Sequence, residues 1–357
     1  MAQTVSATQT SRAVATWLLL LYLMVFAMVI VGGATRLTGS GLSMVQWHPL
    51  MGALPPLSES DWIETFQEYQ ASPQYKLVNH WMLLSDFKRI FLWEYAHRLL
   101  GRLIGVVFLV PWLFFLVRRS LDRPLAWRTF VAFLLGGAQG LLGWFMVKSG
   151  LVDNPEVSHY RLAAHLALAL VVGQYLLWLF LDARRPSARP SPSQSRGMSS
   201  APTWSFIAVL ALQIVFGAFM AGKRAGLVAA TFPDMNGEWI PSTFLIIEPW
   251  WRDLVENPMS IHFLHRLFGV VASLCAVGLA WWVHRRASTH LERSLAWFLA
   301  GLTLVQFALG ALVVIWSVPL SAAIAHQACA FIILSVAVTL AHSQSADLNH
   351  CGVSRTA

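Results

Sequence analysis

The sequence predicts an all-α integral membrane protein, in which eight transmembrane helices form two pseudo-repeated four-helix bundles. Three observations support this fold class. Of the 357 residues, 57% are hydrophobic and only 12% are charged, whereas a soluble domain has about 25% charged residues. Eight apolar runs each reach the roughly 20 residues that a helix needs to cross a bilayer. Motifs of the first half of the chain also return, in the same order, in the second half.

The apolar runs define the predicted membrane helices. They lie at residues 14–34, 95–117, 127–147, 160–182, 204–222, 264–284, 294–316 and 322–343. The first run is longer than the core of a signal peptide, so we expect a retained helix after a short N-terminus, residues 1–13. A Pro/Ser/Arg-rich stretch, residues 183–203, lacks apolar periodicity and predicts a flexible linker. It separates an N-terminal half, residues 14–182, from a C-terminal half, residues 204–343, and residues 344–357 form a tail.

Arginine clusters predict the orientation of these helices. They lie between spans two and three, four and five, and six and seven: Arg118, Arg119, Arg123 and Arg128; Arg184, Arg185, Arg189 and Arg196; Arg285, Arg286 and Arg293. Cytoplasmic loops carry such an excess, so we expect these loops, the linker and both termini in the cytoplasm. The net charge of +8 is then a property of loops, and we expect no nucleic-acid partner.

Three matched features make up the internal repeat. The run from Glu94 to Gly101 resembles the run from His262 to Gly269. A glutamine and a glycine in span three match a pair in span seven, namely Gln139 and Gly143 with Gln306 and Gly310. His165 in span four corresponds to His326 in span eight. The two long outer segments, residues 35–94 and 223–262, are expected to hold short interfacial helices, the first near Asp61-Trp62 and Asp86-Phe87-Lys88.

Four histidines fall inside the spans: His97, His165, His265 and His326. An ionisable side chain within a membrane helix is costly and is a functional candidate by default. The four share a similar depth and occur twice in each half. Two imidazoles that face each other across a bundle suit the axial ligation of a haem iron. Zinc would require a third or fourth ligand, and a single histidine could instead serve only helix–helix hydrogen bonding.

Other residues near these histidines extend the predicted haem sites. Arg98 and Arg266 are candidates to pair with haem propionates, or else are snorkelling interfacial residues. Four glycines are expected to let a flat ring approach the backbone, or else to serve helix packing: Gly101, Gly143, Gly269 and Gly310. Glu94, where the second half has His262, could hold or deliver a proton, or else cap a helix start. This asymmetry predicts one half that does chemistry and one that holds a permanent cofactor.

The remaining histidines and the cysteines carry weaker signals. We expect most of the other histidines to be solvated: His48, His80, His159, His284, His290, His342 and His350. Cys275 and Cys329 fall inside apolar runs and Cys351 in the tail, so no disulfide framework is expected, and Cys329 is interpreted as a packing residue.

Several motifs resemble the haem A synthase family, in its proteobacterial and mitochondrial branch. They are Gly32-Gly33-Ala34-Thr35-Arg36-Leu37-Thr38 with Ser40-Gly41-Leu42-Ser43-Met44, Trp93-Glu94-Tyr95 with His97-Arg98, Ser158-His159-Tyr160-Arg161-Leu162-Ala163-Ala164-His165, and Thr231-Phe232-Pro233-Asp234-Met235-Asn236-Gly237. The resemblance covers roughly residues 14–343. This chain lacks the pair of cysteines that Gram-positive members of the family carry in an outer loop. A disulfide-linked step is therefore not expected here.

The resemblance implies an oxidoreductase of the bacterial inner membrane. Its substrate would be haem O, whose methyl group is oxidised by successive hydroxylations to a formyl group, giving haem A for cytochrome c oxidase. His97 and His165 would bind haem O with Glu94 near the reacting edge, and His265 and His326 would bind a resident haem b on the periplasmic side. Implied partners are haem O synthase, cytochrome oxidase assembly factors, an electron acceptor that the sequence does not identify, and a second copy in a homo-oligomer.

Two other classes remain open at this point. One is a bis-histidine diheme b-type electron-transfer protein, or a haem carrier, that does no chemistry on its haem. Because all four histidines begin on one face of the membrane, transfer of electrons across the bilayer is disfavoured. The other class is a transporter, which typically has inverted repeats and broken helices, whereas these halves are parallel.

Overall fold

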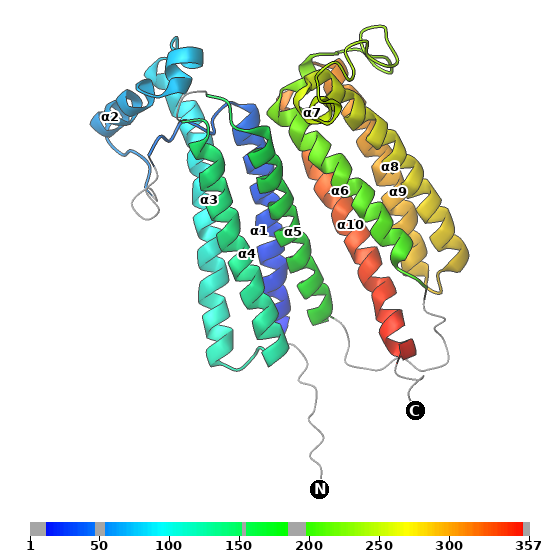
Figure 1. Cartoon of the computed structure of the whole chain (residues 1–357). Helices are drawn as coiled ribbons and strands as arrows, with labels where there is room; N and C mark the ends of the chain where they lie inside the picture. Colours follow the sequence, from blue (N-terminus) through cyan, green and yellow to red (C-terminus); the bar gives the residue numbers. More distant parts are fainter. Residues whose placement is uncertain (1–11, 47–53, 152–154, 185–197, 353–357) are drawn as a thin grey trace.

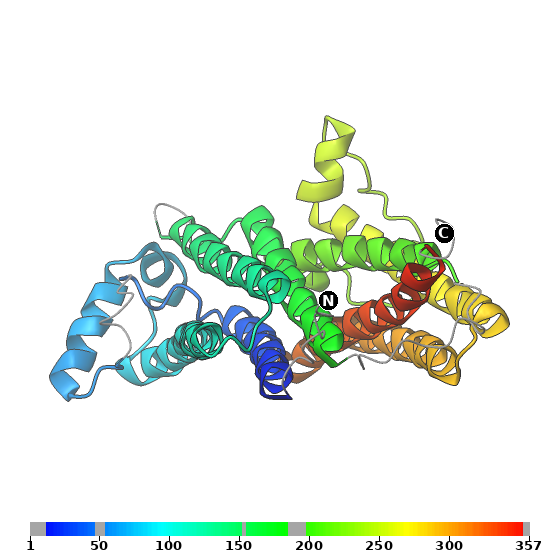
Figure 2. The ribbon, with the colours of Figure 1, turned by 90° about the horizontal axis from the view of Figure 1, so that it is seen from below.

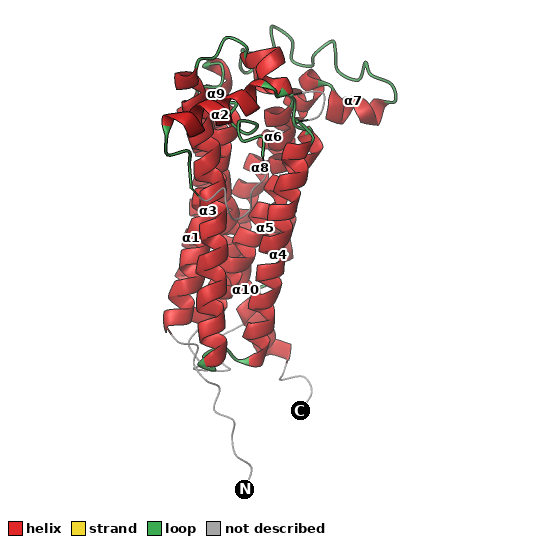
Figure 3. Cartoon of the chain, turned by 90° about the vertical axis from the view of Figure 1, so that its left-hand side faces the viewer, coloured by secondary structure: helices red, strands yellow, loops and turns green. Residues whose placement is uncertain are grey.

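The computed structural model describes residues 12–46, 54–151, 155–184 and 198–352, with side chains as far as residue 345. Within these ranges the regular structure is helical (Figure 3), apart from one isolated bridge between Met235 and Glu238. The elements are α1 (Arg12–Leu37), α2 (Glu59–Gln70), the π-helical turn η2 (Tyr75–Asn79), α3 (Leu84–Val117), α4 (Arg123–Lys148), α5 (His159–Arg184), α6 (Ala201–Gly222), the 3₁₀ turn η3 (Ala225–Leu227), α7 (Trp250–Glu256), α8 (Pro258–Arg286), α9 (His290–Ile315) and α10 (Leu320–Gly352).

Eight of the described helices are long and apolar enough to cross a membrane, namely α1, α3, α4, α5, α6, α8, α9 and α10. Each contains one predicted span, which confirms the predicted number. Two of them begin more than four residues earlier than predicted: α3 at Leu84 and α8 at Pro258. Their first turns mix polar and aromatic residues, so hydropathy alone misses them. Glu94 and His262 consequently lie inside helices.

Short local signals set several helix starts. The side chain of Asp122 accepts from the backbone N–H of Leu125, and Asn257 accepts from that of Met259. Thr289 caps α9 in the same way, through the N–H of Glu292. Each side-chain oxygen satisfies one of the first backbone donors of its helix, which otherwise have no partner.

The membrane helices form two groups of four. In the first group α1 packs on α3 and α5, and α4 packs on α3 and α5. In the second, α6 and α9 each pack on α8 and α10. The groups meet where α10 contacts α1 and α5 and where α5 contacts α6, as the side and end views show (Figures 1 and 2).

Buried contacts tie the two groups together at the crossing of α1, α5 and α10. Ser335 of α10 lies 2.8 Å from the hydroxyl of Tyr22 on α1 and 3.1 Å from the amide nitrogen of Gln174 on α5. Gly173 permits this crossing, because a Cβ there would lie 2.9 Å from Cζ of Phe331. Such close packing leaves little room for the groups to slide.

The outer segments lie together at one end of the helices, which we call the α2/α7 end, and the start of α1 and the end of α10 lie toward the other (Figure 1). Short helices are present as predicted, since α2 contains Asp61-Trp62. The short helix expected at Asp86-Phe87-Lys88 is wrong, because these residues belong to the first turn of α3. Leu57, Trp81 and Trp239 are 77%, 61% and 74% exposed. Their contact with a membrane surface stays a prediction.

Candidate haem sites

The four candidate histidines lie on diagonally opposite helices of each group. His97 on α3 and His165 on α5 are near enough to interact electrostatically. In the other group, the ring centres of His265 on α8 and His326 on α10 are 6.4 Å apart, and the ring planes are inclined by 72°. All four point toward helices of their own group, and each helix that carries them begins at the α2/α7 end.

This geometry fits a haem held by two imidazoles. Nitrogens bound to one metal at about 2 Å each leave the ring centres about 6 to 7 Å apart. The Nδ1 atoms of His165, His265 and His326 are buried and make no hydrogen bond of ordinary geometry with the described residues, although the backbone of Gln213 lies close to His265 and that of Gln306 close to His326. The described residues contain no group of three or more His, Cys, Asp and Glu able to hold a metal ion, as zinc would require.

Each imidazole packs against a glycine of a neighbouring helix. A Cβ at Gly143 would lie 2.8 Å from Cε1 of His165, and one at Gly310 would lie 2.9 Å from Cε1 of His326. The other two contacts come from the first helix of each group, and sequence reasoning missed them: Gly32 against His97 at 3.1 Å and Gly217 against His265 at 3.1 Å. Gly32 and Gly217 both lie five residues before the end of their helix, a signal that a helix-by-helix comparison of the halves could have found.

The other two predicted glycines have a different environment. A Cβ at Gly101 would lie 3.5 Å from Met28, and one at Gly269 would lie 3.3 Å from Gln213. The contact at Gly101 is ordinary helix packing and the one at Gly269 is tighter, and neither involves a candidate histidine. Gln139 and Gln306 hold the backbone next to the glycine-backed rings, because they donate to the carbonyls of His165 and His326 at 3.0 and 2.9 Å.

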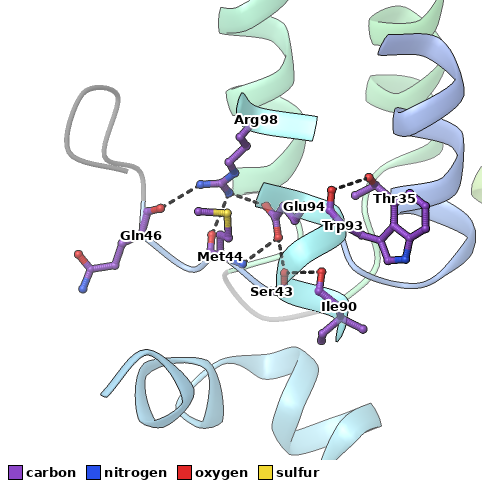
Figure 4. A network of polar contacts seen from close by, with 8 residues as sticks. All are labelled: Thr35, Ser43, Met44, Gln46, Ile90, Trp93, Glu94 and Arg98. Atoms are coloured by element: carbon purple, nitrogen blue, oxygen red, sulfur yellow. Dashed lines mark hydrogen bonds and ion pairs between the residues drawn. The ribbon is translucent and has the colours of Figure 1, made fainter. Parts of the chain in front are cut away.

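Glu94 is 2% exposed and lies in the middle of a polar network (Figure 4). Its carboxylate accepts from the hydroxyl of Ser43 and the backbone N–H of Met44, both at 2.8 Å. It also forms an ion pair with Arg98 at 2.6 Å. Because α3 begins at Leu84, the alternative that Glu94 caps a helix start is wrong.

Arg98 and Arg266 fasten the outer segments to the helices that carry His97 and His265. Arg98 donates to the carbonyls of Met44 and Gln46 at 2.9 and 3.0 Å (Figure 4). Arg266 donates to Nε2 of His262 and to four carbonyls, those of Ala229, Thr231, Pro233 and Asp234. A guanidinium has five N–H donors, so Arg266 is saturated by protein acceptors in this structure. Its predicted contact with a haem propionate stays a prediction.

Two histidines expected to be solvated are buried. His159 is 7% exposed and lies 2.9 Å from the carbonyl of Val255, and His342 is 6% exposed and lies 2.8 Å from Asp182. These two are the exceptions to the expectation that most of these histidines are solvated, and the partner of each is distant in sequence. His80, His284 and His290 are exposed as predicted, and the side chains of His48 and His350 lie outside the described residues. Cys329 packs against the apolar core as predicted, and Cys275 is an exposed free thiol.

Comparison with known proteins assigns the family. Residues 15–338 match the model of the family described as cytochrome oxidase assembly protein. The chain is 44% identical over 333 residues to a haem A synthase of Nitrosospira multiformis, with 93% of each chain covered. It is 44% identical to a haem A synthase of Parvibaculum lavamentivorans, covering 93% of this chain and 94% of that one. A haem A synthase of Rhodospirillum centenum is 43% identical, with 93% and 88% covered.

These matches define a multi-pass membrane protein of haem metabolism. The chain belongs to the cytochrome oxidase assembly protein family, alongside proteobacterial haem A synthases.

Proposed function

We propose that this chain is a haem A synthase, which converts haem O to haem A for cytochrome c oxidase. The methyl carbon of the substrate loses two hydrogen atoms and gains one oxygen atom, a four-electron oxidation that requires an electron acceptor. The observation that carries the proposal is the pair of diagonal histidine sites in a chain whose relatives are haem A synthases.

The two groups of helices have different roles in this proposal. His97 and His165 bind the iron of the substrate haem O, and His265 and His326 bind a resident haem b, which supplies one-electron transfer when bound. The support is the difference at one position: an acid, Glu94, stands where the other group has His262. Apart from this residue the groups share their glycine, glutamine and arginine contacts, so we interpret them as pseudo-repeats.

Glu94 is the proposed proton-handling residue beside the substrate. Its carboxylate lies one helical turn before His97, on the same side of α3. The hydrogen bonds from Ser43 and Met44 fix its position, and the ion pair with Arg98 balances its charge. Residues 43–46 are thereby held over this part of α3, which limits the access of water to the site.

The arginine clusters support an inner-membrane orientation with both termini in the cytoplasm and the haem sites toward the periplasm. Haem O synthase, which supplies the substrate, and the assembly factors that receive haem A are the proposed partners, and homo-oligomers are compatible with this arrangement.

Haem analysis of purified protein tests the proposed function. Protein made in cells that supply haem O should yield haem b together with haem O and haem A on extraction and chromatography. About two haem b per chain, with no haem O or haem A, would instead identify a diheme cytochrome.

The variant Glu94→Gln tests the role of the acid. It should keep the haem content and lower the conversion of haem O by about 10²-fold or more, the usual contribution of general acid–base catalysis. Ser43→Ala is the matched control, since it removes a hydrogen bond to the same carboxylate but keeps the acid. An equal loss in both variants would assign Glu94 to loop anchoring instead.

A further inference from the structure

Arg36 holds a position that the proposed sites have not yet used. It lies on α1 one turn beyond Gly32, the glycine that contacts His97. Residues four apart share a helix face, so Arg36 lies above the imidazole of His97, on the side of the α2/α7 end. It also precedes the outer segment that carries Ser43 and Met44.

The guanidinium of Arg36 has no anion to neutralise it. Arg36 is half-buried, and among the described residues its side chain makes no hydrogen bond or ion pair; only its backbone carbonyl accepts, from the N–H of Gly39. A second cation, Arg224, two residues beyond the end of α6, acts on it electrostatically. A partly buried charge without a partner is costly, and two like charges together increase that cost. A site of this kind is stabilised when an anion binds.

The other cations around the two histidine pairs already have protein acceptors. Arg98 binds Glu94 and two carbonyls, and Arg266 has five acceptors. Lys223, next to Arg224, forms an ion pair with Glu256 at 2.6 Å. The position equivalent to Arg36 in the second group, four residues after Gly217, is Ala221. At this helix position the first group therefore has a cation and the second group does not.

We propose that Arg36, assisted by Arg224, binds a propionate carboxylate of the haem held by His97 and His165. This inference rests on the proposed function, because it takes the haem as the ligand of these histidines. A haem is an apolar ring with two carboxylates on one edge, and that edge is driven toward water and positive charge. Arg36 lies on the water-facing side of His97, and a planar guanidinium matches a carboxylate in a bidentate pair.

The same chemistry would suit the phosphate of an acidic phospholipid, so the test must separate the two sources. The full-length protein, with its resident haem, is placed in nanodiscs of neutral phosphatidylcholine and titrated with iron protoporphyrin IX, followed by the Soret band. A second titration uses the dimethyl ester, which keeps the ring and the iron but lacks both carboxylates.

Arg36→Gln should weaken the binding of iron protoporphyrin IX by about tenfold, as expected for a lost charge-assisted pair. The affinity for the ester should be the same in the variant and in the wild type. Arg36→Lys should retain part of the preference for the free acid, and Arg224→Gln should show a smaller loss than Arg36→Gln. Arg252→Gln, an exposed arginine at the same end of the molecule, is the matched control and should change neither affinity.

An equal loss for the acid and the ester would overturn the proposal, since Arg36 would then only support the fold. An effect of Arg36→Gln that appears only in discs of phosphatidylglycerol would assign the site to a phospholipid and overturn it as well. Haem A formation is assayed separately. A wild-type protein that prefers the free acid but forms no haem A would contradict the proposed function and leave this inference standing.

Discussion

The contact between an imidazole and a glycine limits where each candidate histidine can lie. At Gly143 and Gly310 any larger residue would meet the Cε1 atoms of His165 and His326 at under 3.0 Å. That distance is shorter than real side-chain contacts, so the ring or the helix would have to move. His165 also lies 3.4 Å from the side-chain nitrogen of Gln139, and His326 meets the backbone of Gln306, so the glycine contact is one of several constraints on ring position.

A single methyl group at these positions tests this constraint. Gly310→Ala should reduce the haem b bound per chain, and Gly143→Ala should reduce the binding of added haem, because overpacking costs about 1–3 kcal/mol. The measurement is the haem content of the purified variants. Gly301→Ala on α9 and Gly140→Ala on α4 are matched controls, since a Cβ there meets nothing within 4 Å. Equal haem loss in a control and its test variant would contradict this explanation.

At the scale of elements, a buried carboxylate organises the outer segment between η3 and α8. Asp253 on α7 is fully buried and accepts from the backbone N–H groups of Leu245 and Ile247 at 3.1 and 2.9 Å. The side chains of Asn257 and Ser260 also donate to it. Burial alone would raise the pKa of Asp253, but these hydrogen bonds outweigh it and hold the pKa below its ordinary value.

The lowered pKa of Asp253 predicts how the stability of this segment depends on pH. Because the folded state favours the ionised carboxylate, its contribution is present above about pH 4, the ordinary pKa of Asp, and is lost as the pH falls through the lowered value. At pH 7 the loss of hydrogen bonding in Asp253→Asn should therefore lower the free energy of unfolding by about 1–3 kcal/mol. The variant should accordingly unfold at a lower temperature than the wild type.

Thermal unfolding followed by the intrinsic tryptophan fluorescence of the whole protein, to which Trp250 and Trp251 on α7 contribute among its 17 tryptophans, provides the measurement. The difference between wild type and Asp253→Asn should shrink as the pH is lowered below about 4. A difference that is the same at both pH values would mean that the charge of Asp253 is not what stabilises the segment.

At the scale of the whole molecule, the two groups of helices are joined through α1, α5 and α10 and open toward the same end. His165, His265 and His326 each lie six or seven residues after the start of their helix at the α2/α7 end. His97 lies further along, because α3 begins above the other helices and supports the outer segment through the buried aromatic cluster of Tyr69, Phe87 and Phe91. Both pairs of candidate histidines therefore lie nearer the α2/α7 end of the helices than the opposite end.

Reporter fusions test the orientation. Alkaline phosphatase inserted at Ser242, in the outer segment before α7, should be active because it is exported. The same enzyme at the C-terminus should be inactive, and green fluorescent protein at that position should fluoresce. The physical reason is the arginine excess in the loops at the opposite end. The reverse pattern would place the haem sites on the cytoplasmic side.

The sequence alone determined the number of membrane helices, the family and the residues that could bind iron. These depend on local properties: an apolar run of sufficient length predicts a helix wherever it packs, and an ionisable residue within the run is conspicuous. The same local reasoning misplaced the starts of α3 and α8, because their first turns are stabilised by the outer segments and not by lipid.

Only the tertiary structure decided which residues meet. Gly32 and Gly217 gained a role through helix crossings, Glu94 through the hydrogen bonds of Ser43 and Met44, and His159 and His342 through partners far along the chain. Likewise, only the tertiary structure shows that no acidic side chain among the described residues pairs with the guanidinium of Arg36. Such contacts depend on the relative rotation and depth of whole helices, which the packing of many side chains determines together. No single motif in the sequence encodes them.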